Sequence, residues 1–149
     1  MSDYKIKLQD ITKIKKNIKI AFVVGEFNKN YTSQLEKVNK DFLIKNGFEK
    51  IDSFYVPWAF EIPGMVKRLL KKDKYDLFLT FWVVIRWETP HFDYVCTESS
   101  RWLMDLTLKY ETPIIFGILT CNSEKQVEER IAENYAISWL NLLAECKKN

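Results

Sequence analysis

Hydrophobic and polar positions alternate along the chain in blocks that predict strand, turn and helix in succession. The segment "IKIAFVVG" at 18–25 is a nearly continuous apolar run closed by a glycine, which is typical of a strand buried on both faces of a parallel sheet. After the turn "EFNKN", "SQLE" at 33–36 has the Ser-x-x-Glu spacing of a capping box, and apolar residues then recur at helical spacing as far as Gly47. These blocks predict one strand, one turn and one helix, with the helix beginning near Ser33.

The same unit repeats to the end of the chain. We expect further strands at 51–57, 75–85 and 113–120, helices at 61–72 and 90–110, and one bent helix or two at 123–148. Strands that alternate with helices over short connections predict a single α/β domain across 1–149, in which a four-stranded parallel sheet lies between helix layers as a three-layer sandwich. Ligands of such sheets bind beyond the carboxyl ends of the strands, so the turns that follow the four strands form the candidate functional edge.

Length, charge and cysteine usage narrow the class of protein. The 149 residues fit one domain, and a formal net charge of +3 with scattered lysines gives no reason to expect a nucleic-acid partner. The longest apolar run, "LFLTFWVVI", is far shorter than the ~20 residues of a membrane-spanning helix, and the first residues lack the apolar core of a signal peptide. We therefore expect a cytoplasmic protein without membrane contact. The 3 cysteines have no C-x-x-C pair, which disfavours a zinc site.

The stretch "ETPH" carries the strongest candidate chemistry. Thr89 is a favoured N-cap, proline is favoured at the first helical position, and His91, the only histidine, would be the second helical residue. A helix start of this kind directs unpaired backbone N–H groups at an anion, and an imidazole beside a bound phosphate can act as general acid or base. The competing interpretation is that His91 is simply a tolerated polar residue in a first helical turn.

Other candidates are weaker one by one. Glu61 follows the second strand, and Arg130 in the last helical segment could neutralise a phosphate, although structural ion pairs account for most such residues. Phe27 and Phe116 lie at or just before strand ends, where a ring could stack on a flat ligand, although core packing is commoner. The chain lacks the glycine-rich phosphate-binding motifs, G-x-S-x-G and H-E-x-x-H, which disfavours nucleotide, serine-hydrolase and zinc chemistry.

Four blocks taken together carry a family resemblance. They are "VVGEFN" (23–28), "VPWAFEIP" (56–63), "VVIRWETPHFDYV" (83–95) and "TPIIFGILT" (112–120). In this order they resemble the 6,7-dimethyl-8-ribityllumazine synthase family of riboflavin biosynthesis, and the resemblance extends from about residue 17 to the last helix. It implies the flavodoxin-like lumazine synthase fold.

The resemblance also implies an activity and an assembly. Members of the family are transferases that condense 5-amino-6-(D-ribitylamino)uracil with 3,4-dihydroxy-2-butanone 4-phosphate, losing phosphate and water, without a metal or cofactor. Their site lies between adjacent subunits of a homopentamer, and in many members twelve pentamers close into a 60-subunit shell. An N-terminal arm, here residues 1–16, pairs in the family with the sheet of a neighbouring subunit.

Carried over position by position, the resemblance assigns a role to each site residue. Phe27 would stack on the pyrimidine, and His91 would move protons. The ribityl chain and ring would be held by Ala59, Phe60 and Glu61, the uracil would meet backbone groups of Val83, Val84 and Ile85, and the phosphate pocket would be lined by Glu88 and Thr89. Phe116 and Arg130 would come from the neighbouring subunit, with Arg130 on the phosphate.

The tryptophans depart from the family pattern. The family has glycine at five places where this sequence has Trp58, Trp82, Trp87, Trp102 and Trp139, which are all of its tryptophans, and the chain has only 4 glycines. Independent substitution would scatter tryptophan over positions of many kinds, so one systematic cause is the more economical explanation. Our hypothesis is that the source organism reads UGA as glycine, whereas this sequence was translated with UGA as tryptophan. Genuine indoles beside the phosphate and ribityl chain are expected to abolish the reaction.

A second departure is independent of the genetic code. Ser138 stands where the resemblance places a lysine that assists at the phosphate, and a hydroxyl brings no positive charge. The lost lysine, together with five genuine indoles, would favour a non-catalytic relative that serves as a shell component or binds a flavin or lumazine. An unrelated flavodoxin-like regulator is the third interpretation, and it requires the four blocks to be coincidental.

Overall fold

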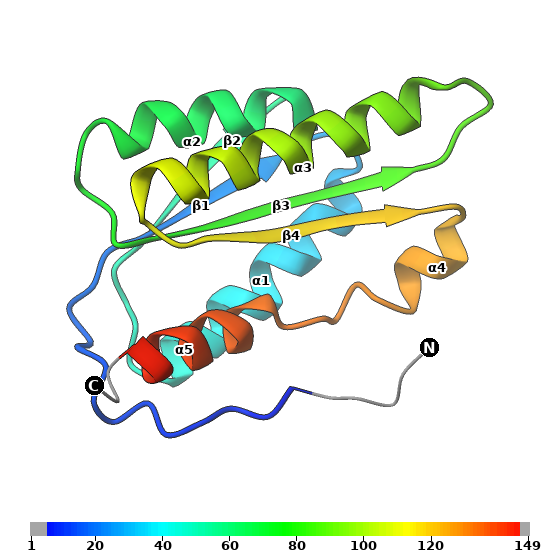
Figure 1. Cartoon of the computed structure of the whole chain (residues 1–149). Helices are drawn as coiled ribbons and strands as arrows, with labels where there is room; N and C mark the ends of the chain where they lie inside the picture. The colour runs from blue at the N-terminus through cyan, green and yellow to red at the C-terminus, as the bar shows by residue number, and fades with distance from the viewer. Residues whose placement is uncertain (1–5, 147–149) are drawn as a thin grey trace.

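The computed structural model describes residues 6–146. At its centre is a sheet of four parallel strands. The strands are β1 (Ile20–Gly25), β2 (Ile51–Val56), β3 (Leu77–Ile85) and β4 (Ile114–Cys121), in the order β2-β1-β3-β4. Helices α1 (Lys29–Lys45) and α5 (Tyr135–Cys146) cover one face, and α2 (Ile62–Leu70) and α3 (His91–Tyr110) cover the other (Figure 1). The predicted α/β sandwich around a four-stranded parallel sheet is confirmed.

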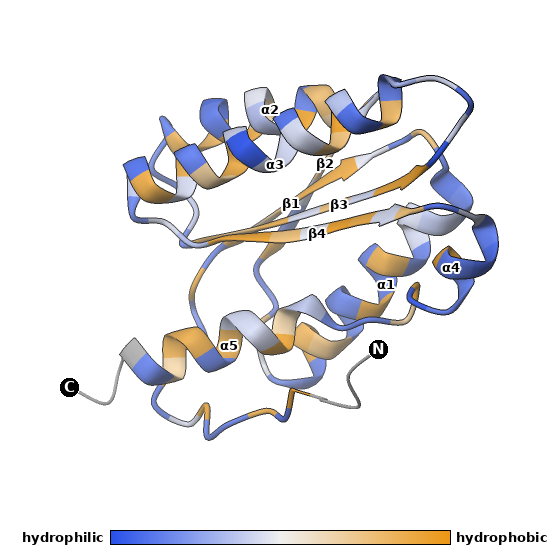
Figure 2. Ribbon diagram, turned by 45° about the vertical axis from the view of Figure 1, so that its right-hand side comes forward, coloured by the Kyte–Doolittle hydropathy of each residue, from blue (hydrophilic) through white to orange (hydrophobic). Residues whose placement is uncertain are grey.

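The sheet separates two apolar cores, because its two central strands are buried on both faces. All six residues of β1 and all but the last of β3 are buried, and alternate side chains enter opposite cores. Phe22 and Phe81 meet edge to face on the side of α1 and α5, whereas Val23 and Trp82 lie on the side of α2 and α3. Figure 2 shows the apolar strands between helices whose outward faces are hydrophilic.

Two short helices lie at the carboxyl edge of the sheet. The 3₁₀-helix η1 (Ala59–Glu61) follows β2 and leads into α2, and α4 (Glu124–Glu128) follows β4. Ser123 caps α4 by accepting a hydrogen bond from the Gln126 N–H. No helix among residues 6–146 is long and apolar enough to cross a membrane.

The capping-box prediction at Ser33 is wrong. Helix α1 begins four residues earlier, at Lys29, after Asn28 in the left-handed conformation with φ 58° and ψ 40°. The Ser33 hydroxyl therefore lies within the helix, where it donates to the Lys29 carbonyl at 2.7 Å. Serine makes this bond to the preceding turn readily, so its presence does not by itself identify a helix start.

The segment at 123–148 forms two helices, which was one of the two expected forms. A non-helical connection at 129–134 separates α4 from α5, and the buried Asn39 side chain holds it against α1. Asn39 donates to the Leu35 and Glu133 carbonyls and accepts from the Ala136 N–H. The chain therefore changes direction between the two helices around a satisfied polar group.

The described part of the expected N-terminal arm runs along α5 of its own chain. The Asn141 side chain accepts a hydrogen bond from the Gln9 N–H and donates one to the Lys7 carbonyl, both at 2.8 Å. Ile14 is 3% exposed and belongs to the core beneath α1 and α5. Pairing of this arm with a neighbouring subunit stays a prediction.

Candidate functional site

A cavity of about 210 Å³ lies at the carboxyl edge of the sheet, on the side of α2 and α3. Its lining includes six of the predicted site residues, which come from the ends of β1 and β3 and the start of α3: Phe27, Val83, Val84, Ile85, Thr89 and His91. Asn28, Phe92, Val95 and three tryptophans, Trp58, Trp82 and Trp87, complete the wall. The location agrees with the expected binding edge of a parallel α/β sheet.

The turn after β1 presents Phe27 to this cavity. The Glu26 and Phe27 N–H groups donate to the Val56 and Pro57 carbonyls, so this turn continues the pairing of β1 with β2. Asn28 then takes the left-handed conformation that favours asparagine or glycine, and its side chain donates to the Val83 carbonyl at 3.0 Å. Phe27 is consequently fixed between the ends of β2 and β3.

The turn after β2 places one indole on Phe27. The Trp58 and Phe27 rings stack with their centroids 4.4 Å apart and an interplanar angle of 24°. The Glu61 carboxylate accepts from the Trp58 backbone N–H at 2.9 Å, which holds the turn. One face of Phe27, the ring predicted to stack on a pyrimidine, is therefore covered by Trp58.

The other predicted residues of this turn do not line the cavity. Ala59 is fully buried in the core on the side of α2 and α3, and the Glu61 carboxylate accepts from the Trp58 N–H. Phe60 is 41% exposed and meets Trp102 of α3 edge to face at 5.2 Å, lining a separate hollow between α2 and α3. Within one subunit, the structure separates Phe60 from His91.

The end of β3 supplies the floor of the cavity. Trp82 is 4% exposed, and its indole N–H donates to the Phe27 carbonyl at 3.0 Å. A side chain at Gly25 would meet this indole at 2.2 Å, so β1 needs glycine beside Trp82. The exposed Trp87 continues the wall after the strand ends.

The start of α3 differs by one position from the prediction. Pro90 is the N-cap and His91 the first helical residue, because the Asp93 and Tyr94 N–H groups both point to the Pro90 carbonyl. His91 remains at the amino end of a helix of 20 residues, where backbone N–H groups have no carbonyl one turn earlier. The imidazole therefore lies at a helix start, as predicted, and anion binding there stays a prediction.

The loop before His91 is held by an ion pair. The Arg86 guanidinium donates to both Asp93 carboxylate oxygens, at 2.8 and 3.2 Å. These hydrogen bonds, reinforced by the positive charge, lower the pKa of Asp93 below its ordinary value. Asp93 is therefore an anion at neutral pH and maintains the bidentate ion pair with Arg86.

Three predicted residues lie away from this cavity. Glu88 is exposed on the loop between β3 and α3. Phe116 was expected at or just before the end of a strand, and this is wrong. It is the third of the eight residues of β4, where it pairs in register with Thr80, and its side chain is 40% exposed. Arg130 follows α4, donates to the Gln126 carbonyl and pairs with Glu129. The suggestion that Phe116 and Arg130 serve a neighbouring subunit stays a prediction.

Metal ligation finds no support in the described part of the chain. No group of three or more histidine, cysteine or carboxylate side chains that could hold a metal ion occurs there. What the cavity does offer is aromatic walls, backbone groups at the end of β3, one imidazole and a helix start. These features suit a planar ring joined to an anionic group.

Comparison with known proteins identifies the family. The model of the family described as 6,7-dimethyl-8-ribityllumazine synthase matches residues 17–148. The chain belongs to this family. A 6,7-dimethyl-8-ribityllumazine synthase of Limosilactobacillus reuteri (strain DSM 20016) is 43% identical over 111 residues, which cover 74% of this chain and 73% of that relative. The resemblance carried by the four sequence blocks is thereby confirmed.

Sequence reasoning missed several residues at this cavity. Asn28 and Phe92 line the cavity, and Arg86 orders the loop beside it. The signal for Asn28 was its place in the turn after β1, at the predicted functional edge. Arg86 and Asp93 lie seven residues apart on a strand end and a helix, so their pairing depends on how the loop folds.

Proposed function

We propose that this chain is a 6,7-dimethyl-8-ribityllumazine synthase, which condenses 5-amino-6-(D-ribitylamino)uracil with 3,4-dihydroxy-2-butanone 4-phosphate. The observation that carries the proposal is the cavity at the carboxyl edge, whose lining includes Phe27, the end of β3 and His91. Membership of the family supports the same reaction. The proposal extends to assembly as homopentamers, or shells of them, in the cytoplasm.

Each group of the cavity has a part in the proposed reaction. Phe27 stacks on the pyrimidine ring, while backbone groups of Val83, Val84 and Ile85 hydrogen bond to its polar edge. The amino end of α3 and Thr89 hold the phosphate of the second substrate, since a helix start favours an anion. His91, beside that phosphate, moves protons during Schiff-base formation, phosphate elimination and ring closure.

The remaining predicted residues would complete the site when subunits assemble. Ala59 supports the turn after β2, while Phe60 and Glu61 approach the ribityl chain, and Glu88 borders the phosphate on the exposed loop. Phe116 and Arg130 of a neighbouring subunit complete the site, with Arg130 as the phosphate's cationic partner. Arg130 carries particular weight in this arrangement because Ser138 supplies no charge.

Glycine at the five tryptophan positions is part of the proposal. Three observations support it: Trp58 covers one face of Phe27, the cavity of about 210 Å³ is smaller than the ~300 Å³ at which ligand pockets usually begin, and the buried indole N–H of Trp139 has no hydrogen-bond partner within residues 6–146. An unpaired buried donor costs roughly 1–3 kcal/mol. Glycine would remove each of these conflicts.

The covered Phe27 also favours a second candidate, a non-catalytic relative. If the indoles are genuine, Trp58, Trp82 and Trp87 make the cavity an aromatic binding site for a single planar ring, such as a flavin or lumazine. The phosphate of a second substrate would then have no room. This candidate retains the fold and the assembly without the reaction.

Intact-mass measurement with peptide mapping, on the protein purified from its own source, separates the two candidates. Glycine at 58, 82, 87, 102 and 139 is the expected result, and the same preparation should convert the two substrates into lumazine. Tryptophan at these positions, together with the absence of turnover, would replace the synthase with the non-catalytic binder.

A further inference from the structure

Arg86, the first residue after β3, contacts both β4 and the first turn of α3. Its backbone N–H donates to the Cys121 carbonyl at the end of β4, and its Nε donates to the Asn122 side chain at 3.0 Å. Its terminal nitrogens bind the Asp93 carboxylate in the first turn of α3. The guanidinium also lies 4.2 Å from the centre of the Phe92 ring.

These contacts enclose a short and exposed connection. Only residues 86–90 join β3 to α3, and all of them are exposed, so little packing fixes their path. Asp93 and Phe92 directly follow His91, and Phe92 and His91 both line the cavity. Whatever holds Phe92 and Asp93 therefore also sets the direction of the imidazole.

We propose that Arg86 is a positioning residue, which through Asp93 and Phe92 holds the first turn of α3 so that His91 faces the cavity. The inference rests on the proposed function, since it assigns Arg86 to the proton-transfer step. Both terminal nitrogens of Arg86 donate to the Asp93 carboxylate, and Arg86 is not part of the cavity lining, so its role acts through Asp93 and Phe92.

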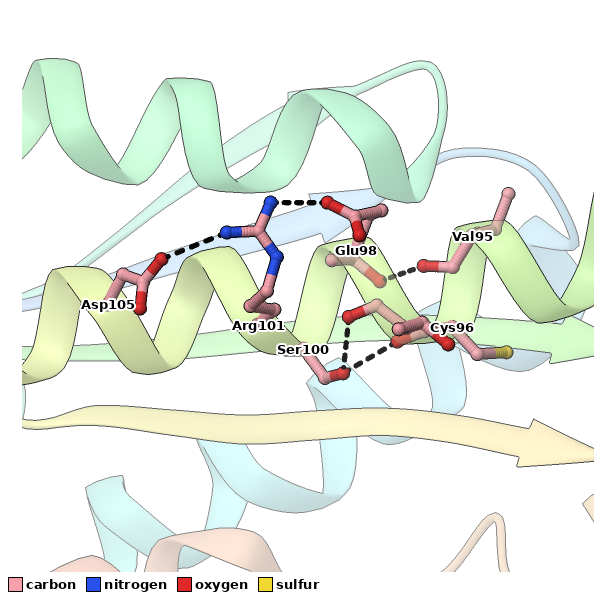
Figure 3. A network of polar contacts seen from close by, with 8 residues as sticks. Val95, Cys96, Glu98, Ser100, Arg101 and Asp105 are labelled. Carbon is pink, nitrogen blue, oxygen red and sulfur yellow. Dashed lines mark hydrogen bonds and ion pairs between the residues drawn. The ribbon is translucent and has the colours of Figure 1, made fainter.

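Exposure separates this role from a general contribution to stability. The Arg86 and Asp93 side chains are 43% and 58% exposed, and ion pairs so open to solvent contribute little to folding. Arg101 on the same helix provides the contrast: it pairs with Glu98 and Asp105, both within α3 (Figure 3). Among the described residues the ion pairs of Arg101 stay within one helix, so it is the matched control for Arg86.

Four variants test the inference: Arg86→Met, Asp93→Ala, the combination of both, and Arg101→Met as the control. We expect Arg86→Met and Asp93→Ala each to lower kcat by about 10- to 100-fold, the range that a misplacement of roughly 1 Å produces, with little change in KM. The double variant should lose no more than either single variant, because both substitutions break one connection. Arg101→Met should retain the kcat of the unchanged protein.

Direct binding of the substrate phosphate by Arg86 gives different results. Asp93→Ala would then free the guanidinium and preserve turnover, Arg86→Met would raise KM, and the losses would not coincide. Either of those results would overturn the positioning role. So would equal activity of Arg86→Met and Arg101→Met.

A spectroscopic measurement keeps the inference testable without turnover. His91 is the only histidine of the chain, so in a tag-free protein labelled with ¹³C-histidine one imidazole signal reports its position. We expect this signal to move in Arg86→Met and in Asp93→Ala, and to stay in place in Arg101→Met. An unmoved signal in both variants overturns the inference, whereas the absence of turnover in the unchanged protein counts against the proposed function alone.

Discussion

Replacing Trp58 with glycine tests directly whether the indole obstructs the site. In the structure Trp58 lies on Phe27 with ring centroids 4.4 Å apart, in the place that the proposal gives to the pyrimidine. A planar ligand must displace this indole before it can stack on Phe27. Trp58→Gly removes the indole that competes with the ligand for the Phe27 ring, and it leaves the turn that carries Phe27 unchanged in sequence.

The magnitude follows from the stacking energy. An aromatic pair of this geometry contributes about 0.5–1.5 kcal/mol, so its displacement weakens ligand binding by roughly 2- to 10-fold. Trp58→Gly should therefore tighten binding of 6,7-dimethyl-8-ribityllumazine by that factor. The same change should lower the free energy of unfolding by about 1–2.5 kcal/mol, since the stack is lost and glycine adds about 0.5–1 kcal/mol of backbone entropy cost.

Isothermal titration with the lumazine and urea unfolding measure the two effects. Phe54→Ala is the control, because Phe54 lies edge-on to Tyr75, neither residue lines the cavity or belongs to the proposed site, and its loss should leave lumazine affinity unchanged. Weaker lumazine binding by Trp58→Gly would refute the reasoning. The indole would then be a wall of the binding site and not an obstruction.

Three further predictions concern the reaction, the core and the response to pH. His91→Asn should lower kcat by about 10²- to 10⁴-fold with little change in KM, measured by steady-state formation of the lumazine. Asn39→Ala should lower the free energy of unfolding in urea by about 1–3 kcal/mol, because the Glu133 carbonyl loses its bond from Asn39, whereas the Ala136 N–H keeps the Asn134 side chain as an acceptor. Burial, and then the hydrogen bond to Asp52, raise the pKa of Tyr75 to about 12, so its contribution to stability is full below about pH 10 and is lost as pH rises towards 12. Thermal unfolding between pH 9 and 12 should show a smaller loss for Tyr75→Phe than for the unchanged protein.

The two central strands, β1 and β3, could be predicted because burial on both faces leaves a nearly continuous apolar run. The observed β1 and β3 begin two residues later than expected, and β3 ends at the predicted Ile85. The start of α1 could not be predicted from Ser33, because a serine hydroxyl bonds to the preceding helical turn as readily as it caps a helix. The decisive feature was the left-handed backbone of Asn28, which depends on its contact with β3.

The cavity lining was predictable where residues lie in the turns after strands, and less so where loops meet. Phe27 was expected at the functional edge because the carboxyl ends of parallel strands converge there, and His91 because Thr-Pro-His is typical of a helix start; both line the cavity. The stack of Trp58 on Phe27 joins two turns far apart in sequence, and nothing in either turn specifies it. The same holds for the contact of Arg86 with Asp93, which depends on the path of the intervening loop.

The central claim is that the cavity between Phe27 and His91 is a lumazine synthase site. Its most direct test is steady-state formation of 6,7-dimethyl-8-ribityllumazine from the two substrates by the protein purified from its own source. The account predicts turnover that requires both substrates, releases inorganic phosphate and falls by about 10²- to 10⁴-fold with His91→Asn. Turnover that is unchanged by His91→Asn would contradict the assignment of the site, and the absence of any turnover would contradict the proposed reaction.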